Sequence, residues 1–283
     1  MKAKKVEEAI VKVLMVVATL IVLASLVLIV AVVLIKGLPA MNLDMITKTP
    51  KGGYYLGKEG GILNAIIGSL SLTAGATFLA ILMSLPVAIY LNIYAHRDSK
   101  LTHFTRVSLD VLWGVPSIVY GAFGFTIMLF FGIRASLLGG IIAVSLLIFP
   151  IMSRAMDEVI RMVPQELLEA SYSVGATKLE TALKVITRQT LPGLLSAVLI
   201  AFGRGIGDAA SVIFTAGFSD RIPLSLLQPA ATLPLAIFFQ LGTPFFEVQE
   251  RAYASAFILT VMILVISITA RILTRKYNKH IVK

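Results

Sequence analysis

The sequence contains no cysteine, which excludes disulfide bonds and thiolate metal sites within the chain. Charged residues are scarce as well. They make up 14% of the 283 residues, whereas a soluble domain carries about a quarter. Apolar residues reach 58% and the mean hydropathy is +0.92. This balance places the chain outside the class of soluble globular proteins.

Patterns for catalysis and metal binding are missing too. His96, His103 and His280 have no cluster of cysteines or carboxylates beside them in the sequence, so we expect solvated side chains, no metal site and no cofactor. No arrangement of Ser, His and Asp predicts a nucleophile. The stretch GGYYLGK at 52–58 nearly matches a phosphate-binding loop, but Glu59 replaces the required Ser or Thr and no strand precedes it. We therefore expect a protein that is not itself an enzyme.

Long apolar runs are the main feature that is present. Residues 13–35 carry no charge, and a run of about 18 or more apolar residues indicates a membrane span. The same run is too long for the apolar part of a signal peptide, so we expect a first helix that is not cleaved. The sequence predicts an all-α integral membrane protein with six transmembrane helices, at residues 13–35, 62–92, 111–131, 137–153, 192–215 and 253–272.

A further apolar segment, 229–246, is interrupted by Pro229, Pro234, Gly242 and Pro244. We interpret it as a re-entrant or interfacial helix, because irregular backbone at membrane depth is tolerated where protein buries it. With both termini inside, the inner segments hold seventeen of the 25 lysines and arginines and the outer segments seven. Basic residues gather on the cytoplasmic side, so we expect both termini to be cytoplasmic. The net charge of +10 is then a topology signal and gives no reason to expect nucleic acid.

Small residues recur at helical spacing along three of the predicted spans. Such stripes let membrane helices approach each other closely. They are also compatible with the lining of a pore, and spacing alone leaves both interpretations open. The three sets are Ser69, Thr73, Thr77, Ala80 and Ser84; Gly114, Ser117, Gly121 and Gly124; and Gly203 with Gly207.

The longest inner loop covers about 154–191. Pro164 suits the first turn of a helix, and Glu166 and Glu169 follow it near the positive end of the helix dipole. Gly175 then interrupts a pattern that resumes as a second amphipathic stretch at 177–186. A helix–Gly–helix element of this kind predicts either a docking surface for another protein or a connector that lies on the lipid.

The stretch PQELLEASYSVGATKLETALKVI, at 164–186, resembles the EAA loop of bacterial ABC-importer permeases. Glu169, Ala170 and Gly175 fall on the family pattern. The resemblance implies that this loop docks on a separate ATPase subunit. A Leu-Pro pair that the family places at 187–188 is replaced by Thr-Arg here and follows instead at 191–192, so we expect the helix to continue further before it enters the membrane.

Three other stretches resemble the PstA-type permease subunits of phosphate importers: GVPSIVYGAFG at 114–124, FGRGIGDAASVIFTAG at 202–217 and QPAATLPLAIF at 228–238. The resemblance implies a type I ABC importer permease fold in the cell membrane of a prokaryote. It divides the chain into an N-terminal part, 1–60, and a permease core, 61–283. The implied partners are a second, PstC-type permease subunit, two ATPase subunits and an extracytoplasmic phosphate-binding protein. A PstC-type identity remains open.

Two opposite charges lie inside the fifth predicted span. Arg204 and Asp208 are four residues apart, and with Ser211 and Thr215 they would form one polar stripe on a continuous helix. Charged residues at membrane depth are costly and tend to mark a substrate path. A guanidinium suits a tetrahedral oxyanion because its planar fork donates two parallel hydrogen bonds. The resemblance departs at Asp208, where the phosphate permeases have glutamate.

Three alternatives remain at this point. Arg204 and Asp208 also fit a salt bridge to a partner subunit that only fixes assembly. One arginine does not distinguish phosphate from sulfate or molybdate. An ion-coupled secondary carrier would also place a carboxylate in the membrane, although no internal repeat supports that class and an EAA-like loop has no role in it.

Overall fold

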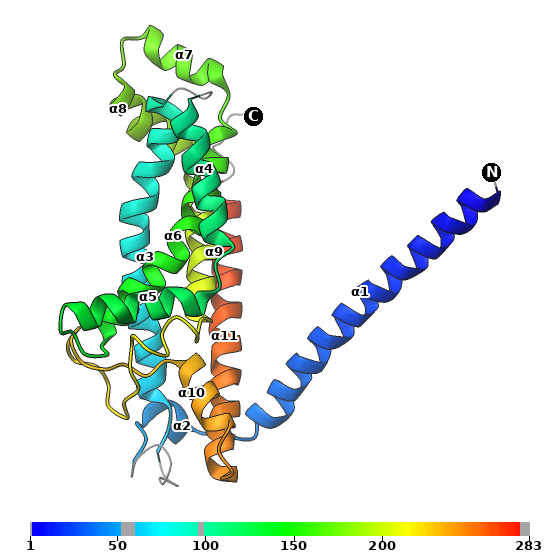
Figure 1. The fold of residues 1–283 in the computed structure, drawn as a ribbon, viewed down its shortest axis with the longest axis vertical. Helices are drawn as coiled ribbons and strands as arrows, with labels where there is room; N and C mark the ends of the chain where they lie inside the picture. The colour runs from blue at the N-terminus through cyan, green and yellow to red at the C-terminus, as the bar shows by residue number, and fades with distance from the viewer. Residues whose placement is uncertain (1, 52–59, 96–98, 278–283) are drawn as a thin grey trace.

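The computed structural model describes residues 2–51, 60–95 and 99–277, and the regular elements within these ranges are helices (Figure 1). The near-match to a phosphate-binding loop at 52–58, His96 and His280 lie outside the described residues. The elements are α1 (Lys2–Gly37), α2 (Leu43–Thr47), α3 (Leu63–Ile89), the π-helix η1 (Tyr90–Tyr94), α4 (Lys100–Trp113), α5 (Ser117–Phe130), α6 (Leu137–Arg161), α7 (Gln165–Ser173), α8 (Lys178–Glu180), the π-helix η2 (Thr181–Ile186), α9 (Thr187–Ile206), α10 (Leu233–Leu241) and α11 (Phe246–Tyr277).

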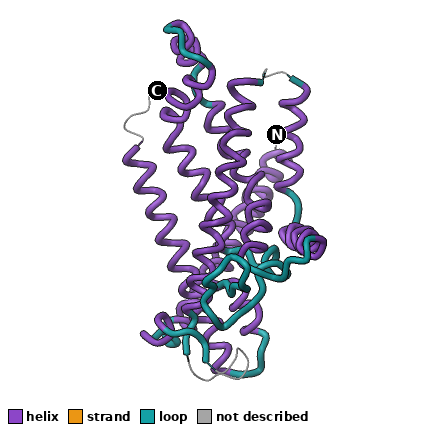
Figure 2. The backbone as a smooth tube through the Cα atoms, turned by 90° about the vertical axis from the view of Figure 1, so that its left-hand side faces the viewer, coloured by secondary structure: helices purple, strands orange, loops and turns teal. Residues whose placement is uncertain are grey.

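Five helices in the described part of the chain are long and apolar enough to cross a membrane, and a sixth crossing follows if α4 and α5 count together. This agrees with the predicted six spans and all-α class. The central helix is α6, which packs against α3, α9, α5 and α4 and is the most buried of the spans. Figure 2 shows the long helices side by side, with the longest loops gathered at the end away from α7 and α8.

The third predicted span, 111–131, is wrong as a single helix. The helix begins earlier, at Lys100, ends at Trp113 and resumes as α5 after a bend of 99°. Pro116 explains the break, because it lacks an amide hydrogen and forces the residue before it out of the helical region. The Tyr120 hydroxyl braces the bend by donating a 2.8 Å hydrogen bond to the carbonyl of Leu112. The GVPSIVYGAFG stretch therefore contains the bend and the first half of α5.

Two predicted boundaries around the inner loop also move. The fourth span was expected to end at 153, but α6 continues to Arg161. The fifth was expected to occupy 192–215, whereas its helical stretch runs from Lys178 to Ile206 and the chain then turns. The early start confirms that the helix continues past positions 187–188. The early end separates Arg204 from the residues predicted to share its stripe.

The segment at 229–246 does not cross the bundle, as predicted. Its helix α10 has nine residues, a length of roughly 14 Å at 1.5 Å per residue, against about 30 Å for a hydrocarbon core. The extended residues before it are buried at the end of the bundle opposite α7. The Leu233 amide donates a 2.8 Å hydrogen bond to the Ser69 hydroxyl on α3, and the Ala230 amide donates one of 2.9 Å to the carbonyl of Ala216.

Two of the three small-residue stripes serve packing. All five residues of the α3 stripe are buried, and α3 lies along α6 over most of its length. On α5, a Cβ at Gly121 would lie 2.8 Å from the Ser211 carbonyl oxygen, so only glycine allows that approach. Gly203 differs: no atom lies within 4 Å of the place where its Cβ would be. Gly203 therefore makes no close helix–helix contact in this subunit.

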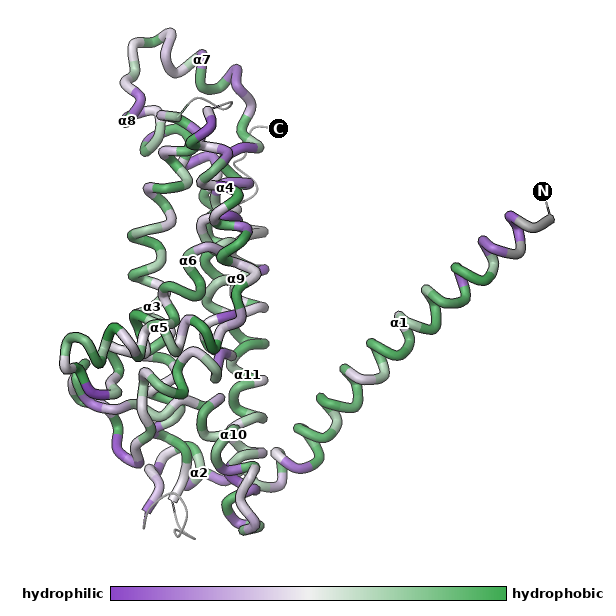
Figure 3. The backbone as a smooth tube through the Cα atoms, viewed as in Figure 1, coloured by the Kyte–Doolittle hydropathy of each residue, from purple (hydrophilic) through white to green (hydrophobic). Residues whose placement is uncertain are grey.

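Helix α1 leaves the bundle at an angle and is apolar along most of its length (Figures 1 and 3). It contacts α11 near its C-terminal end, where Gly37 lies against Tyr253 and Phe257. The start of α1 and the end of α11 both point toward the end of the molecule that carries α7 (Figure 1). The division at residue 60 stays a prediction. Met45 and Ile62, on either side of that boundary, pack in one cluster.

Candidate functional site

Arg204 lies in the last turn of α9 and is half-exposed, with 49% of its side-chain surface accessible. A cation is favoured at a helix C-terminus, because it faces the partial negative charge of the unpaired carbonyl groups. The terminal Nη2 atom lies 3.9 Å from Oδ1 of Asp208, which is a loose ion pair. Most donors of the guanidinium are therefore available on an open face of this subunit.

Asp208 is buried and has a second role that the sequence did not indicate. Its Oδ2 atom accepts hydrogen bonds from the Ser211 amide, at 2.8 Å, and from the Ser211 hydroxyl, at 2.5 Å. An Asp that bonds the backbone of a following residue stabilises a turn. Asp208 thus fixes the turn that ends α9 and points its other oxygen toward Arg204.

The predicted polar stripe is not formed as predicted, because the helix ends before Asp208. Ser211 and Thr215 are fully buried. The Ser211 hydroxyl is used by Asp208, and the Thr215 hydroxyl donates a 2.9 Å hydrogen bond to the Ser211 carbonyl. These two residues hold the turn together, and Arg204 alone among the four presents its polar atoms at the surface.

Glycines on α5 and α6 determine where this turn lies. A Cβ at Gly124 would come within 3.3 Å of the Thr215 methyl group, and a Cβ at Gly139 would lie 2.9 Å from the Thr215 carbonyl oxygen. The Ser136 amide donates a 2.9 Å hydrogen bond to that same carbonyl. The turn after α9 is therefore held between two helices, and Arg204 is positioned by tertiary packing.

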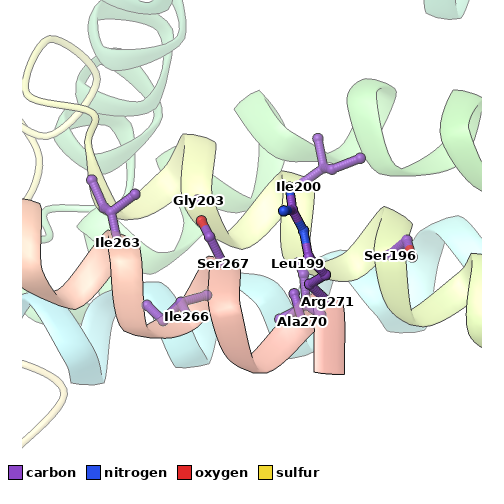
Figure 4. A pocket seen from close by; sticks show the side chains of 9 residues that line it. All are labelled: Ser196, Leu199, Ile200, Gly203, Ile263, Ile266, Ser267, Ala270 and Arg271. Atoms are coloured by element: carbon purple, nitrogen blue, oxygen red, sulfur yellow. The ribbon is translucent and has the colours of Figure 1, made fainter. Parts of the chain in front are cut away.

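A groove extends along α9 from Gly203 toward the α7 end of the molecule. It lies between α9 and α11, has a volume of about 580 Å³ and includes Gly203, the neighbour of Arg204. Figure 4 shows the Arg271 side chain reaching across this groove from α11 toward α9, beside Leu199 and Ile200. Ser196 and Ser267 are the other polar side chains that line it. The walls are otherwise apolar.

A second hollow, of about 610 Å³, lies beside the turn that follows α9. It is lined by Gly207 and Ala209 from the turn and by α10 residues that include Ile237 and Phe238. Gly203 and Gly207 thus border two different hollows, with Arg204 between them in the chain. Arg204 itself does not line either hollow.

The predicted docking loop forms a separate, protruding element at one end of the bundle (Figure 1). Helix α7 carries Glu169 and Ala170 on its exposed surface and ends before Gly175, whose φ of +83° is a left-handed conformation that favours glycine. The buried hydroxyls of Ser171 and Thr181 share a 2.8 Å hydrogen bond, which ties α7 to the helix that follows. The helix–Gly–helix prediction for this loop is confirmed.

One cluster near this loop was not predicted. Asp157 of α6 is fully buried and accepts hydrogen bonds from Arg106 Nε and Nη2 and from Arg154 Nη1, each 2.9 Å long, and one of 2.7 Å from Asn92. From the sequence alone, both arginines are interpreted only as inner-side positive charge. The alternation of Arg106 with Asp110, and of Arg154 with Asp157, was the available signal.

At the opposite end, a hollow of about 720 Å³ is bordered by Thr49, Ser219 and Arg221. Partial burial raises the pKa of the adjacent carboxyl of Asp220 above its usual value, and the positive charge of Arg251 opposes that rise. This end therefore presents both charged groups and a concave surface outside the spans.

Comparison with known proteins identifies the family. The family described as "Binding-protein-dependent transport system inner membrane component" matches residues 84–283. The chain belongs to this family. The match includes the bend at Pro116, the Asp157 cluster, the α7 loop and Arg204, so the features described above lie within the part that defines a permease of this kind. The chain is accordingly a multi-pass membrane protein and a transport subunit.

Relatives within the family are permeases named for phosphate transport. The chain is 33% identical over 245 residues to the phosphate transport system permease protein PstA of Pasteurella multocida, covering 86% of each chain. It is 34% identical to the PstA protein of Yersinia pestis, over 87% of this chain and 82% of that one. It is 35% identical to PstA 1 of Mycobacterium tuberculosis, over 75% and 69%.

Solved structures confirm the fold of this permease. An inward-facing structure of the MetNI methionine ABC transporter aligns with a TM-score of 0.63 at 18% identity, covering 76% of this chain and 95% of that one. An amino acid ABC transporter aligns with a TM-score of 0.57 at 22% identity, over 76% and 93%. At these identities the likeness concerns architecture alone. It confirms the predicted type I ABC importer permease fold.

Proposed function

We propose that this chain is a PstA-type, membrane-spanning subunit of an ATP-driven phosphate importer. It forms the translocation path together with a second, PstC-like permease subunit. Support comes from relatives that are named phosphate permeases and match most of the chain, and from an open arginine at the end of a transmembrane helix. The names of the relatives favour the PstA type, whereas the arginine does not distinguish the two permease types.

The observation that carries the substrate assignment is the environment of Arg204. Its guanidinium is half-exposed at the end of a transmembrane helix, and Asp208 contacts it at 3.9 Å. The C-terminal end of α9 by itself repels an anion, so the fixed positive charge must supply the attraction. A bidentate contact with phosphate oxygens suits a guanidinium. We assign substrate binding to Arg204, positioning of that arginine to Asp208, and support of the Asp208 turn to Ser211 and Thr215.

The coupling role belongs to the α7 loop. Glu169, Ala170 and Gly175 lie on a protruding and exposed element, as a docking contact requires. We propose that two separate ATPase subunits bind this loop and its counterpart in the second permease subunit. ATP binding and hydrolysis by those subunits would then alternate the direction in which the path opens, and this chain needs no nucleotide or cofactor of its own.

The orientation follows from the charges. We place the α7 end, both termini and the basic residues Arg154, Arg161 and Arg188 in the cytoplasm of a prokaryotic cell. The opposite end, with the hollow beside Arg221, then faces outward and receives an extracytoplasmic phosphate-binding protein.

Transport by the reconstituted complex tests the proposal. Proteoliposomes that contain this subunit, a second permease subunit, the ATPase and the binding protein should take up radiolabelled phosphate when ATP is present on the cytoplasmic side. A hundredfold excess of sulfate or molybdate should leave that uptake intact. Inhibition by sulfate or molybdate, together with their own uptake, would identify the subunit as a permease for another oxyanion.

A further inference from the structure

Helix α4 is attached to the bundle mainly by charge. Of its 14 residues, Thr102 and Leu109 are buried, and α6 is its principal neighbour. Arg106 and Asp110 lie one turn apart on α4, and each pairs with a residue of α6. Arg106 binds Asp157 with two hydrogen bonds of 2.9 Å, and Asp110 accepts one of 2.7 Å from Arg154.

The same cluster joins a third element. The π-helix η1 at the end of α3 presents Asn92, whose side-chain amide donates a 2.7 Å hydrogen bond to Asp157. Arg154 extends the network outward, because its Nη2 atom lies 3.5 Å from Glu158. Single-turn π-helices recur at functional sites. Three helices, η1, α4 and α6, therefore meet at one buried carboxylate.

The position of Asp157 connects this cluster to the docking loop. Asp157 lies one helical turn before α6 ends at Arg161, and Pro164 then forms the N-cap of α7. A force applied to α7 by a bound ATPase acts directly on this last turn of α6. Contacts that hold α4 to that turn are therefore the first within the bundle to feel the displacement.

A second set of contacts continues from α4 to the proposed substrate site. Helix α4 ends in the bend at Pro116, and α5 beyond the bend packs at Gly121 against Ser211. Ser211 is the residue that holds Asp208, the neighbour of Arg204. A swing of α4 would thus move the support of the turn that carries Asp208.

We propose that Asp157, with Arg106 and Arg154, forms a latch that holds α4 against α6 and opens when the docking loop is displaced. This inference rests on the proposed transport function. Apolar side chains would hold two helices together at lower cost than a buried carboxylate with two arginines. Charged hydrogen bonds are directional, however, and water can replace them when the helices separate. Asp157 is a positioning residue and does not touch substrate.

A reversible cross-link tests whether the latch opens. Asp110 and Glu158 are both exposed and both contact the Arg154 guanidinium, and the chain has no native cysteine. In the Asp110→Cys/Glu158→Cys variant, a short disulfide-containing thiol cross-linker should reduce phosphate uptake at least tenfold relative to the same preparation before linking. Reducing agent should restore it, and each single-cysteine variant should not respond. Uptake that continues in the linked protein means that the contact is static and overturns the proposal.

A second experiment does not depend on cysteine chemistry. In the reconstituted complex, Asp157→Asn should leave the subunits assembled, and ATP hydrolysis should no longer require the binding protein, so that the stimulation ratio falls toward one. Arg106→Lys, which keeps the charge and loses the two-pronged contact, should give an intermediate ratio. A wild-type ratio in both variants, or failure of both to assemble, assigns the network to fold maintenance. If the unmodified complex takes up no phosphate while this ratio still falls, the proposed substrate is wrong and the latch stands.

Discussion

The carboxylate of Asp208 lies between two partners: Oδ2 is bound by Ser211, and Oδ1 faces the Arg204 guanidinium at 3.9 Å. The aspartate therefore does not depend on the arginine for its hydrogen bonds. Removing the arginine therefore leaves a carboxylate whose Oδ2 atom still accepts two hydrogen bonds from Ser211, and this bears on any experiment on Arg204. The subunit should tolerate that change better than the breaking of an isolated buried pair, which costs about 3–5 kcal/mol.

Arg204 should be required for transport and dispensable for assembly. Loss of a charge-assisted contact worth about 1.5–3 kcal/mol corresponds to a roughly 10- to 100-fold loss of affinity. Arg204→Gln should therefore lower phosphate uptake by at least that factor, and Arg204→Lys should be impaired because it lacks the planar fork. Uptake in proteoliposomes and co-purification of the subunits are the two measurements.

The double variant Arg204→Gln/Asp208→Asn separates this role from an assembly salt bridge. If the pair only fixed assembly, removal of both charges would restore the complex and its uptake. We expect normal assembly in the single variant and no recovery of uptake in the double. Recovered uptake would remove Arg204 from the substrate path.

Reversal of charge at Glu169 should uncouple the permease from its ATPase. The residue is exposed on α7, so Glu169→Lys should leave the fold intact while opposing the docked surface. We expect uptake and co-purification of the ATPase to fall severalfold, with the affinity for the binding protein unchanged. Asp44→Lys makes the same charge change at the other end of the molecule and should leave ATPase binding at the wild-type level. Equal retention of ATPase by both variants would contradict a docking role for α7.

Thiol labelling should establish the orientation. Single cysteines at Ser225 and Phe246, which are exposed on either side of α10, should both react with an impermeant reagent added outside intact cells. A cysteine at Val174, 85% exposed beside Gly175, should react only after the membrane is opened. Labelling of one position from outside and the other from inside would make 229–246 a crossing.

Two glycine substitutions should have opposite consequences. A Cβ at Gly68 would overlap the carbonyl oxygen of Ala231, whereas Gly203 has nothing within 4 Å. Gly68→Ala should destabilise the isolated subunit by about 1–3 kcal/mol, the usual effect of overpacking, seen as a lower melting temperature in detergent. Gly203→Ala should leave that temperature equal or slightly higher.

The open side of Gly203 gives the same pair a second readout. If the second permease subunit packs there, Gly203→Ala should weaken co-purification of that subunit although the single chain is stable. Unchanged assembly would mean that the Gly203–Gly207 face does not contact the partner.

The sequence predicted the helical class, the six crossings and the helix–Gly–helix loop, because long apolar runs and a glycine between two amphipathic stretches can be recognised locally in the sequence. It did not predict that α4 begins at Lys100. The charges of Arg106 and Asp110 are typical of a solvated loop, and they are satisfied only by Arg154 and Asp157 from a distant part of the chain.

The end of α9 could not be predicted for a similar reason. Residues after Ile206 remain apolar and small, so periodicity favours a longer helix. The chain turns because Asp208 binds Ser211 and because glycines on α5 and α6 leave room for the turn. Arg204 was a candidate from its charge alone, whereas its half-exposed position depends on that tertiary packing.

The single attachment of α1 has a consequence for how the protein is made. No residue in its apolar window is buried against the rest of the chain, and its 36 residues amount to a rod of about 54 Å at 1.5 Å per residue. Such a helix can enter the bilayer as soon as it is synthesised, without waiting for any later segment. Biogenesis then has two independent steps, insertion of an anchor followed by assembly of the bundle, and a mutation within α1 would reduce the amount of protein in the membrane while leaving the activity of each inserted molecule unchanged.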